Sequence, residues 1–358
     1  MARYAELLTQ ALLFESNSSQ IKVSRINLAL PHSLLLRVPT SFRSWLHHFW
    51  IMLNASTKLN KINADIFHII DGSQAYISEW IKHPVSIATS HDIIPFLQLL
   101  GRFGNLQLGG SSRWLIKKSI KGLRQVEHVI AVSNNTASDL SSFAKVDPKA
   151  ISVIPHAFYP GISTYANSNP PLSWSERRES KQAFILHVGN NAFYKNREGL
   201  FRIFSRIRSS CPIKLKLVGS DASQGERQII KKLGIKNHVS FIIDSDDAKL
   251  FDLYQKACLF LFPSLYEGFG WPPLEAMALG CPVVCSNAAS LPEVVGDAAL
   301  ICSPKDEEEI AENCLTVLQD ASVANRLIER GYSRVKMFSL ERMGRQVMEV
   351  YTRVLNEV

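Results

Sequence analysis

The stretch that decides the fold runs from residue 262 to residue 282 and reads FPSLYEGFGWPPLEAMALGCP. An apolar strand ends at Phe262, and Gly268 and Gly270 in the following turn allow backbone N–H groups to approach a ligand closely. The pair Pro272-Pro273 is typical of the first positions of a helix. Because a helix that begins after a glycine-rich turn suits a phosphate group, the stretch predicts an anion-binding strand–turn–helix unit.

Two carboxylates flank the turn. Glu267 follows the strand, and Glu275 falls in the first turns of the helix. Both side chains can face one pocket, where carboxylates would accept hydrogen bonds from the neighbouring hydroxyls of a sugar. The simpler alternative is an exposed Glu267 in an ordinary turn and a Glu275 that is stabilised by the positive end of the helix.

Strand and helix patterns alternate through the rest of the second half. The expected strands span residues 184–188, 214–218, 239–243, 258–262 and 283–285, and the expected helices span residues 196–209, 224–233, 247–257 and 273–279. Strands of continuous apolar character fit a parallel sheet that is covered on both faces. The alternation therefore predicts a Rossmann-like open sheet, which binds ligands at the carboxyl ends of its strands.

The first half shows the same rhythm after an amphipathic helix over residues 1–14. Its expected strands span residues 66–70, 85–89, 129–132 and 151–154. With 358 residues, the chain is long enough for two domains. We expect an N-terminal domain over residues 1–165, a polar linker over 166–182, a C-terminal domain over 183–335 and a final helix within 336–358.

The amino-acid composition excludes several structural classes of protein. A hydrophobic fraction of 46% and a charged fraction of 20% exclude disordered, collagen-like and coiled-coil proteins. No apolar run is long enough for a membrane span, and the six cysteines do not have the spacing of a zinc site. Because the first residues do not resemble a signal peptide, we expect a cytoplasmic protein.

Positive charge is concentrated in the first half. Residues 1–165 contain 16 Lys and Arg against 9 Asp and Glu, whereas residues 166–358 contain 24 against 23. An anionic partner, such as a phosphorylated substrate, an acidic membrane surface or a nucleic acid, would explain this excess. Solubility alone would explain it equally well.

The stretch at residues 262–282 resembles the nucleotide-sugar signature of the retaining glycosyltransferases of family 4, a mannosyltransferase-like group of glycosyltransferases. In that signature, two glutamates separated by seven positions flank Gly-Phe-Gly, and the likeness continues through residues 288–296. The resemblance is dense over residues 184–358 and thinner over 62–158. It implies an α/β protein of GT-B architecture, with two Rossmann-like domains facing each other across a cleft and the C-terminal helix returning to the N-terminal domain. Compared with the family, the N-terminal domain lacks its first strand.

The resemblance also assigns roles within this stretch. Glu267 holds the position of the glutamate that contacts the transferred hexose, and Glu275 that of the glutamate that binds the ribose. The backbone amides of Gly268, Phe269 and Gly270 would meet the sugar and the diphosphate.

Upstream, the segment over residues 187–196 resembles the family's strand–turn–lysine segment. Gly189 and Asn190 would line the donor site, and Lys195 matches the lysine that neutralises the departing diphosphate. Family members often carry an arginine near Asn190 or Asn191. The asparagines at both positions leave the second positive group of the site unidentified.

In the first half, residues 90–96 resemble the family's His-Asp-x-x-Pro segment. His91 would therefore contact the donor sugar near the reacting carbon and act with Glu267 in catalysis. A lone histidine is more often a hydrogen-bonded structural residue. His156, which follows a strand in a second family-like segment, is a further candidate for the cleft.

Two other features have competing interpretations. The run from Asp244 to Asp247 could hold a divalent cation, or it could begin a helix. Arg113, Lys117, Lys121 and Arg124 share one helical face, with Trp114 placed off that face. That face is either a peripheral contact with an anionic membrane or an ordinary solvated surface.

Taken with the resemblance, the sequence predicts a retaining, metal-independent glycosyltransferase with no cofactor. It would move a hexose, which we take to be mannose, from a nucleotide-sugar donor to a glycan or lipid-linked acceptor in polysaccharide biosynthesis, at the inner face of the cytoplasmic membrane. The alternative is a non-catalytic, nucleotide-binding or scaffolding relative. A nucleic-acid partner is not expected, because the chain has no recognition motif for one.

Overall fold

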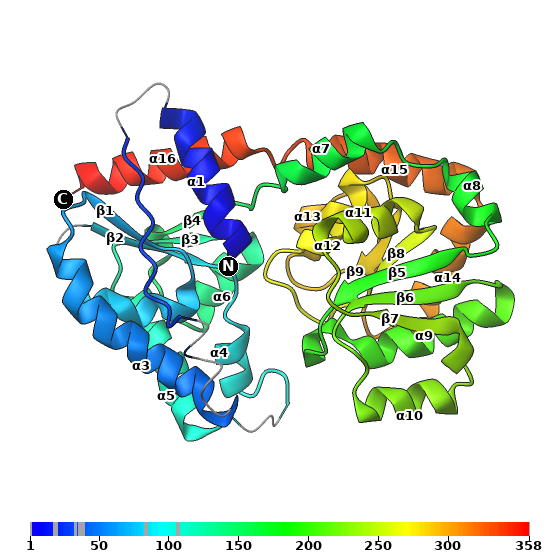
Figure 1. The fold of residues 1–358 in the computed structure, drawn as a ribbon, viewed down its shortest axis with the longest axis horizontal. Coiled ribbons are helices and arrows are strands. Elements are labelled where there is room, and N and C mark those ends of the chain that lie inside the picture. Colours follow the sequence, from blue (N-terminus) through cyan, green and yellow to red (C-terminus); the bar gives the residue numbers. More distant parts are fainter. Residues whose placement is uncertain are drawn as a thin grey trace. The chain divides into compact units, whose positions relative to one another are not determined.

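The computed structural model describes residues 2–16, 21–31, 34, 40–81, 85–104 and 108–357. The chain divides into two compact units (Figure 1). Unit 1 comprises Met1–His156 and Leu340–Val358, and unit 2 comprises Ala157–Ser339. Across the described ranges, no helix combines the length and the apolar character that a membrane span requires.

Unit 1 is built on a parallel sheet whose strand order β1-β2-β3-β4 follows the chain. The strands are β1 (Ile66–Ile69), β2 (Val85–Ser90), β3 (His128–Ala131) and β4 (Ile151–Val153). Every residue of β2 and β3 is buried, because these strands lie between neighbours in a sheet covered by helices. The helices of unit 1 are α1 (Ala2–Ser16), α3 (Thr40–Lys58), η1 (Leu59–Lys61), η2 (Gly72–Trp80), α4 (Ile94–Leu99), α5 (Gly110–Leu123), α6 (Asn134–Ser142), η3 (Pro148–Ala150) and α16 (Leu340–Asn356).

The two ends of unit 1 pack together. Helix α1 contacts α16, the last helix of the chain (Figure 1). The inner face of α1 is the predicted apolar stripe, whose members Tyr4, Leu7, Leu8, Ala11 and Leu12 are all buried. Among the described residues, α1 precedes the first strand, β1.

Unit 2 holds a six-stranded parallel sheet of order β10-β9-β8-β5-β6-β7. Its strands are β5 (Phe184–Gly189), β6 (Lys214–Gly219), β7 (Val239–Ile242), β8 (Leu259–Phe262), β9 (Val283–Ser286) and β10 (Ala299–Cys302). Its helices are α7 (Pro160–Ser168), α8 (Trp174–Glu179), η4 (Phe193–Lys195), α9 (Arg197–Ser210), α10 (Gln224–Lys232), η5 (Lys236–His238), α11 (Asp247–Lys256), α12 (Trp271–Ala278), α13 (Leu291–Val295), α14 (Glu307–Gln319) and α15 (Ala321–Val335). After β5, the chain adds β6 and β7 on one side of that strand. It then crosses to the other side of β5 and adds β8, β9 and β10.

Two expectations about the domain boundaries and the linker are corrected, and one strand is new. The segment over 166–182 is not a bare linker: it carries the end of α7 and all of α8, and it belongs to unit 2. Ser173 and Glu176 form a capping box that starts α8, and the Trp174 indole is buried and donates a hydrogen bond to the Cys258 carbonyl. The units divide after His156 and before Leu340 rather than at residues 165 and 336. The strand β10 was not predicted.

Candidate functional site

The predicted donor-binding residues of the second half gather where the sheet of unit 2 changes direction. Strands β5 and β8 are neighbours, yet the chain leaves β5 toward β6 and leaves β8 toward β9. In an open parallel sheet, the crevice at the carboxyl ends of two such strands is where ligands bind. The loop after β5 and the loop after β8 both start from this crevice.

Hydrogen bonds tie the two loops together. The backbone N–H of Leu265 donates to the Tyr194 carbonyl at 2.7 Å, and the Asn196 side chain donates to the Pro263 carbonyl at 3.0 Å. Asn196 has φ +53°, a left-handed conformation that asparagine tolerates better than most residues. The loops are therefore held as one unit that presents η4 beside the turn after β8.

Lys195 and Glu267 form a buried ion pair at this junction. The Lys195 Nζ lies 2.8 Å from Glu267 Oε1, and the two side chains are only 13% and 9% exposed. The ammonium also lies 5.0 Å from the centre of the Phe262 ring. Because water is largely excluded, the attraction between the charges is stronger than it would be at the surface. The structure thus brings together two of the residues that the sequence singled out separately.

The loop after β5 carries the other two residues predicted upstream. Gly189 ends β5, and a Cβ at this position would lie 3.1 Å from His187 Nε2 and 3.5 Å from the Lys195 side chain. Asn190 is exposed, and its Oδ1 accepts a hydrogen bond from the backbone N–H of Ala192 at 3.0 Å. A side chain at Gly189 would thus crowd the His187 ring at the end of the strand.

The turn from Glu267 to Gly270 is held by hydrogen bonds from a buried serine. Ser290 Oγ lies 2.9 Å from the Glu267 carbonyl and 2.6 Å from the Phe269 carbonyl, and this serine is fully buried. Gly270 has φ +123°, and a Cβ there would lie 2.9 Å from the Leu291 side chain, so the position requires glycine. Gly268 and Phe269 are buried, and the turn leads into the first residue of α12.

Glu275 lies inside α12 and has a partner that the sequence did not suggest. The Tyr254 hydroxyl donates to Glu275 Oε2 at 3.2 Å, with Tyr254 fully buried and Glu275 6% exposed. Tyr254 comes from α11, 21 positions earlier in the chain. Such a hydrogen bond fixes the rotamer of the carboxylate. The apolar pattern of α11 predicts a buried ring at this position, but nothing in the pattern shows where the hydroxyl points.

A second positively charged side chain, Arg197, lies close to the loop after β5, and it already forms an ion pair. Arg197, the first residue of α9, is 3% exposed and its Nε lies 2.9 Å from Glu226 Oε1. One of its terminal nitrogens donates to the Ser220 carbonyl at 2.9 Å and to Asn191 Oδ1 at 3.3 Å. Arg197 thus links the loop after β5 to the loop after β6 by hydrogen bonds.

His187, the first residue of the family-like segment, is fully buried. Its Nδ1 lies 3.0 Å from the Leu261 carbonyl and therefore carries the proton. Burial, reinforced by the nearby Lys195 and Arg197, lowers the pKa of this imidazole to about 3. His187 is thus a neutral link between β5 and β8.

His91 belongs to unit 1, where it follows β2. Its Nε2 lies 2.9 Å from the Ile70 carbonyl, and its Nδ1 lies 3.0 Å from His156 Nε2. Burial lowers the pKa of both imidazoles, so each is neutral at pH 7. His91 then donates through Nε2 and accepts through Nδ1. Both ring nitrogens are engaged within unit 1, and the role of His91 toward a sugar stays a prediction.

The acidic run after β7 is occupied in starting a helix. Asp246 is the N-cap residue of α11, and its carboxylate accepts from the backbone N–H of Lys249 at 2.8 Å. Asp244 has φ +53° in the preceding turn. The helix-start interpretation of this run accounts for the conformation observed.

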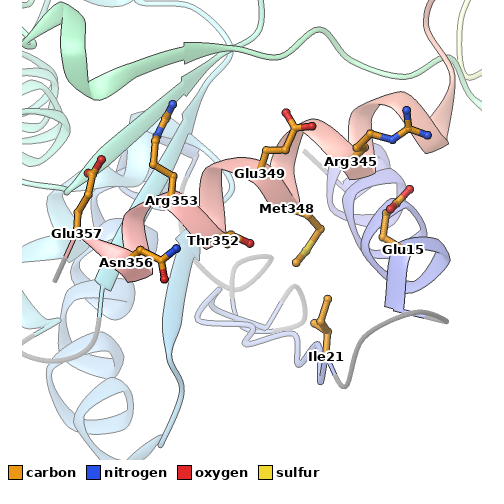
Figure 2. Close-up of a pocket in the computed structure, with 9 residues that line it drawn as sticks. All are labelled: Glu15, Ile21, Arg345, Met348, Glu349, Thr352, Arg353, Asn356 and Glu357. Atoms are coloured by element: carbon orange, nitrogen blue, oxygen red, sulfur yellow. The ribbon is translucent and has the colours of Figure 1, made fainter.

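A groove of about 670 Å³ opens on unit 1 along α16 (Figure 2). Met348 of α16 and Ile21 point toward one another across it, and charged side chains of both signs surround them. None of the predicted site residues lines this groove.

Two family models match the chain, one over each half. The model described as glycosyl transferases group 1 matches residues 169–334, and the model described as glycosyltransferase family 4 matches residues 15–159. Together they cover the sheets of both units.

Relatives with described functions match over part of the chain. The O-antigen chain mannosyltransferase B of Escherichia coli is 36% identical over 177 residues, which is 48% of this chain and 46% of that protein. The MMP alpha-(1->4)-mannosyltransferase of Mycolicibacterium hassiacum is 29% identical over 253 residues, 69% of this chain and 59% of that protein. The matches thus span about half to three-fifths of the length of these relatives.

Solved structures share the fold. WaaG, a glycosyltransferase involved in lipopolysaccharide biosynthesis, superposes with a TM-score of 0.71 at 15% identity, over 98% of this chain and 96% of that one. The predicted α/β class with GT-B architecture is therefore confirmed. The chain belongs to the family 4 type of the group 1 glycosyltransferases.

Proposed function

We propose that the chain transfers a hexose from a nucleotide diphosphate sugar to a hydroxyl of a glycan or lipid-linked glycan, with retention at the anomeric carbon. The observation that carries the proposal is the buried Lys195–Glu267 pair at the switch point of unit 2, beside the glycine turn that begins α12. This arrangement offers a cation and backbone amides to a diphosphate, and a carboxylate to a sugar.

The hexose proposed is mannose, and the pathway proposed is polysaccharide biosynthesis. Support comes from the relatives, of which the Escherichia coli and Mycolicibacterium hassiacum proteins are both named mannosyltransferases. The first of these is an O-antigen chain enzyme. The partners proposed are accordingly a nucleotide-sugar donor and a growing glycan.

Each residue of the site has a proposed role toward the donor. Glu275, oriented by Tyr254, would accept hydrogen bonds from the ribose hydroxyls. Lys195 would turn from Glu267 toward the diphosphate as negative charge develops on the leaving group. Glu267 would then be free to accept hydrogen bonds from the hexose. His91 would contact the hexose, as the family resemblance implies.

The transfer step requires no separate general base, because the leaving group can take the acceptor's proton. The bond from the anomeric carbon to the diphosphate oxygen breaks and its electron pair stays on the diphosphate. The acceptor oxygen forms the new bond on the same face of the sugar, and its proton passes to the departing phosphate oxygen. Because Lys195 supplies positive charge at the diphosphate, we propose that no metal ion is needed.

The test is turnover of a donor panel. GDP-mannose, UDP-glucose, ADP-glucose and dTDP-glucose are incubated with the protein, with and without mannoside acceptors and EDTA, and nucleoside diphosphate release is measured. One donor class should react, EDTA should have no effect, and proton NMR should show the donor's anomeric configuration in the product. Lys195→Gln should lower kcat about 100-fold or more, whereas Lys214→Gln, an exposed lysine at the opposite end of β6, should not.

Other outcomes separate the alternatives. Inverted product would overturn the stereochemical proposal, and loss of activity in EDTA would overturn metal independence. Tight donor binding without release from any donor–acceptor pair would favour the non-catalytic, nucleotide-binding alternative.

A further inference from the structure

Helix α3 of unit 1 carries an exposed apolar stripe. Trp45, Phe49 and Leu53 are spaced four residues apart, so they share one face of the helix. Their exposed fractions are 56%, 45% and 54%. The rings of Trp45 and Phe49 stack with their centres 5.3 Å apart and their planes within 6°. Large aromatic side chains in such a row are costly to leave in water.

The opposite face of α3 is already packed against unit 1. Ile51 and Ala55 are buried, and His48 Nδ1 lies 2.9 Å from the Tyr76 hydroxyl of η2. The stripe is therefore not the face that stabilises the fold. A helix that is apolar on both faces is typical of a helix with a second apolar environment.

Helix α5 of the same unit supplies positive charge. Arg113, Lys117 and Lys121 are exposed, and so is Trp114, at 49%. Trp114, which the sequence places off the face of these cations, is thus exposed on the same helix. Neither residues 40–62 nor residues 110–125 contain an aspartate or a glutamate.

Both helices are fixed to the same element, η2. On the α5 side, Ser119 Oγ donates to the Ser73 carbonyl at 2.5 Å, and Lys118 pairs with Glu79 at 2.8 Å. On the α3 side, the contact is the His48–Tyr76 hydrogen bond. Figure 1 shows α3 and α5 in unit 1, both of which contact η2. The apolar stripe and the basic residues thus lie on two helices that pack on the same element.

We propose that this α3–α5 surface, defined by the stripe Trp45, Phe49 and Leu53 and by the basic helix α5, docks on an anionic phospholipid bilayer. Tryptophan and phenylalanine insert at the boundary between headgroups and acyl chains, and lysine and arginine pair with anionic headgroups. A nucleic acid would satisfy the cations but not the aliphatic Leu53 or the stacked rings. The inference rests on unit 1 alone and does not depend on the proposed function.

The experiment is sedimentation of the full chain with lipid vesicles. Vesicles of phosphatidylglycerol and phosphatidylcholine in equal parts should bind the protein, and vesicles of phosphatidylcholine alone should bind it much more weakly. Raising the salt concentration should release it. The variant Arg113→Gln/Lys117→Gln keeps the Lys118 and Lys121 pairs with Glu79, and should lower the partition coefficient about 30-fold.

The variant Trp45→Ser/Phe49→Ser tests the stripe. It should lower the partition coefficient at least tenfold, while circular dichroism and the thermal midpoint stay within error of the wild type, because both side chains are exposed. The matched control is Leu172→Ser/Ile243→Ser in unit 2, whose side chains are 49% and 50% exposed. The control should bind like the wild type.

Three results would overturn the proposal. The first is a wild type that does not sediment with anionic vesicles. The second is unchanged binding by the stripe variant. The third is equal loss in the control variant. Tight binding to duplex DNA that competes with the vesicles and survives Trp45→Ser/Phe49→Ser would instead assign the surface to nucleic acid.

Discussion

Lys195 and Glu267 show what can and cannot be predicted at the scale of single residues. The sequence singles out each of them from its local motif, one after β5 and the other after β8. Their ion pair joins positions 72 residues apart, and it exists because β5 and β8 are neighbours in the sheet. Local patterns carry no information about that neighbourhood. The same reason applies to Glu275 and Tyr254, which meet only after α11 and α12 have packed.

A histidine of unit 1, His68, gives a prediction about how the stability of this unit depends on pH. His68 Nε2 lies 2.7 Å from Thr89 Oγ1, and its Nδ1 lies 2.6 Å from the Tyr351 hydroxyl. Burial lowers the pKa of His68 to about 3, whereas the unfolded chain has a value near 6.5. Below pH 6.5 the unfolded state therefore binds more protons than the folded state, and stability falls as the pH falls.

From this single group, unit 1 should lose of order 1–2 kcal/mol of unfolding free energy between pH 7.5 and pH 5. The measurement is the urea concentration at which peptides of β1 and β2 lose protection in pulsed hydrogen exchange, at the two pH values. The variant His68→Asn should show a smaller pH-dependent loss, and His238→Asn, in unit 2, should keep the wild-type loss. An equal loss in wild type and His68→Asn would show that His68 is not the titrating group.

At the scale of elements, the packing of α5 on η2 depends on one glycine. A Cβ at Gly122 would overlap the backbone carbonyl of Ala75, whereas a Cβ at Gly110, in the first turn of the same helix, would meet nothing within 4 Å. Gly122→Ala should therefore force the two elements apart and destabilise unit 1 by about 1–3 kcal/mol. Gly110→Ala should be neutral or slightly stabilising, because alanine is the better helix former.

The check is the thermal midpoint of both variants. Gly122→Ala should melt at a lower temperature than the wild type, and Gly110→Ala should not. Equal midpoints for the two variants would mean that α5 does not approach η2 as closely as described.

Most of the described strands follow from hydrophobic periodicity, whereas β10 and α8 are two elements that it missed. β10 has the sequence Ala-Leu-Ile-Cys, and an apolar run of four residues does not by itself distinguish a strand from part of a buried helix. In α8, the six residues include five polar or charged ones, and the helix is held by a capping box and by Trp174. A polar composition therefore predicted a linker where tertiary contacts stabilise a helix.

At the scale of the whole molecule, the chain leaves unit 1 after His156 and returns to it at Leu340. The alternation of strands and helices predicts two Rossmann-like halves, because each strand must be followed by a helix that covers the sheet. The crevice of unit 2 follows from the strand order, which the resemblance implies and periodicity alone does not. The central claim is that this crevice binds a nucleotide sugar.

Isothermal titration calorimetry of GDP-mannose and UDP-glucose into the wild type, Glu275→Ala and Glu312→Ala tests this claim most directly. One donor should bind the wild type and the Glu312→Ala control, whose side chain is exposed on α14. Glu275→Ala should bind it at least tenfold more weakly, because hydrogen bonds to a charged carboxylate are lost. Equal affinities for the three proteins, or no binding of either donor by the wild type, would contradict the account.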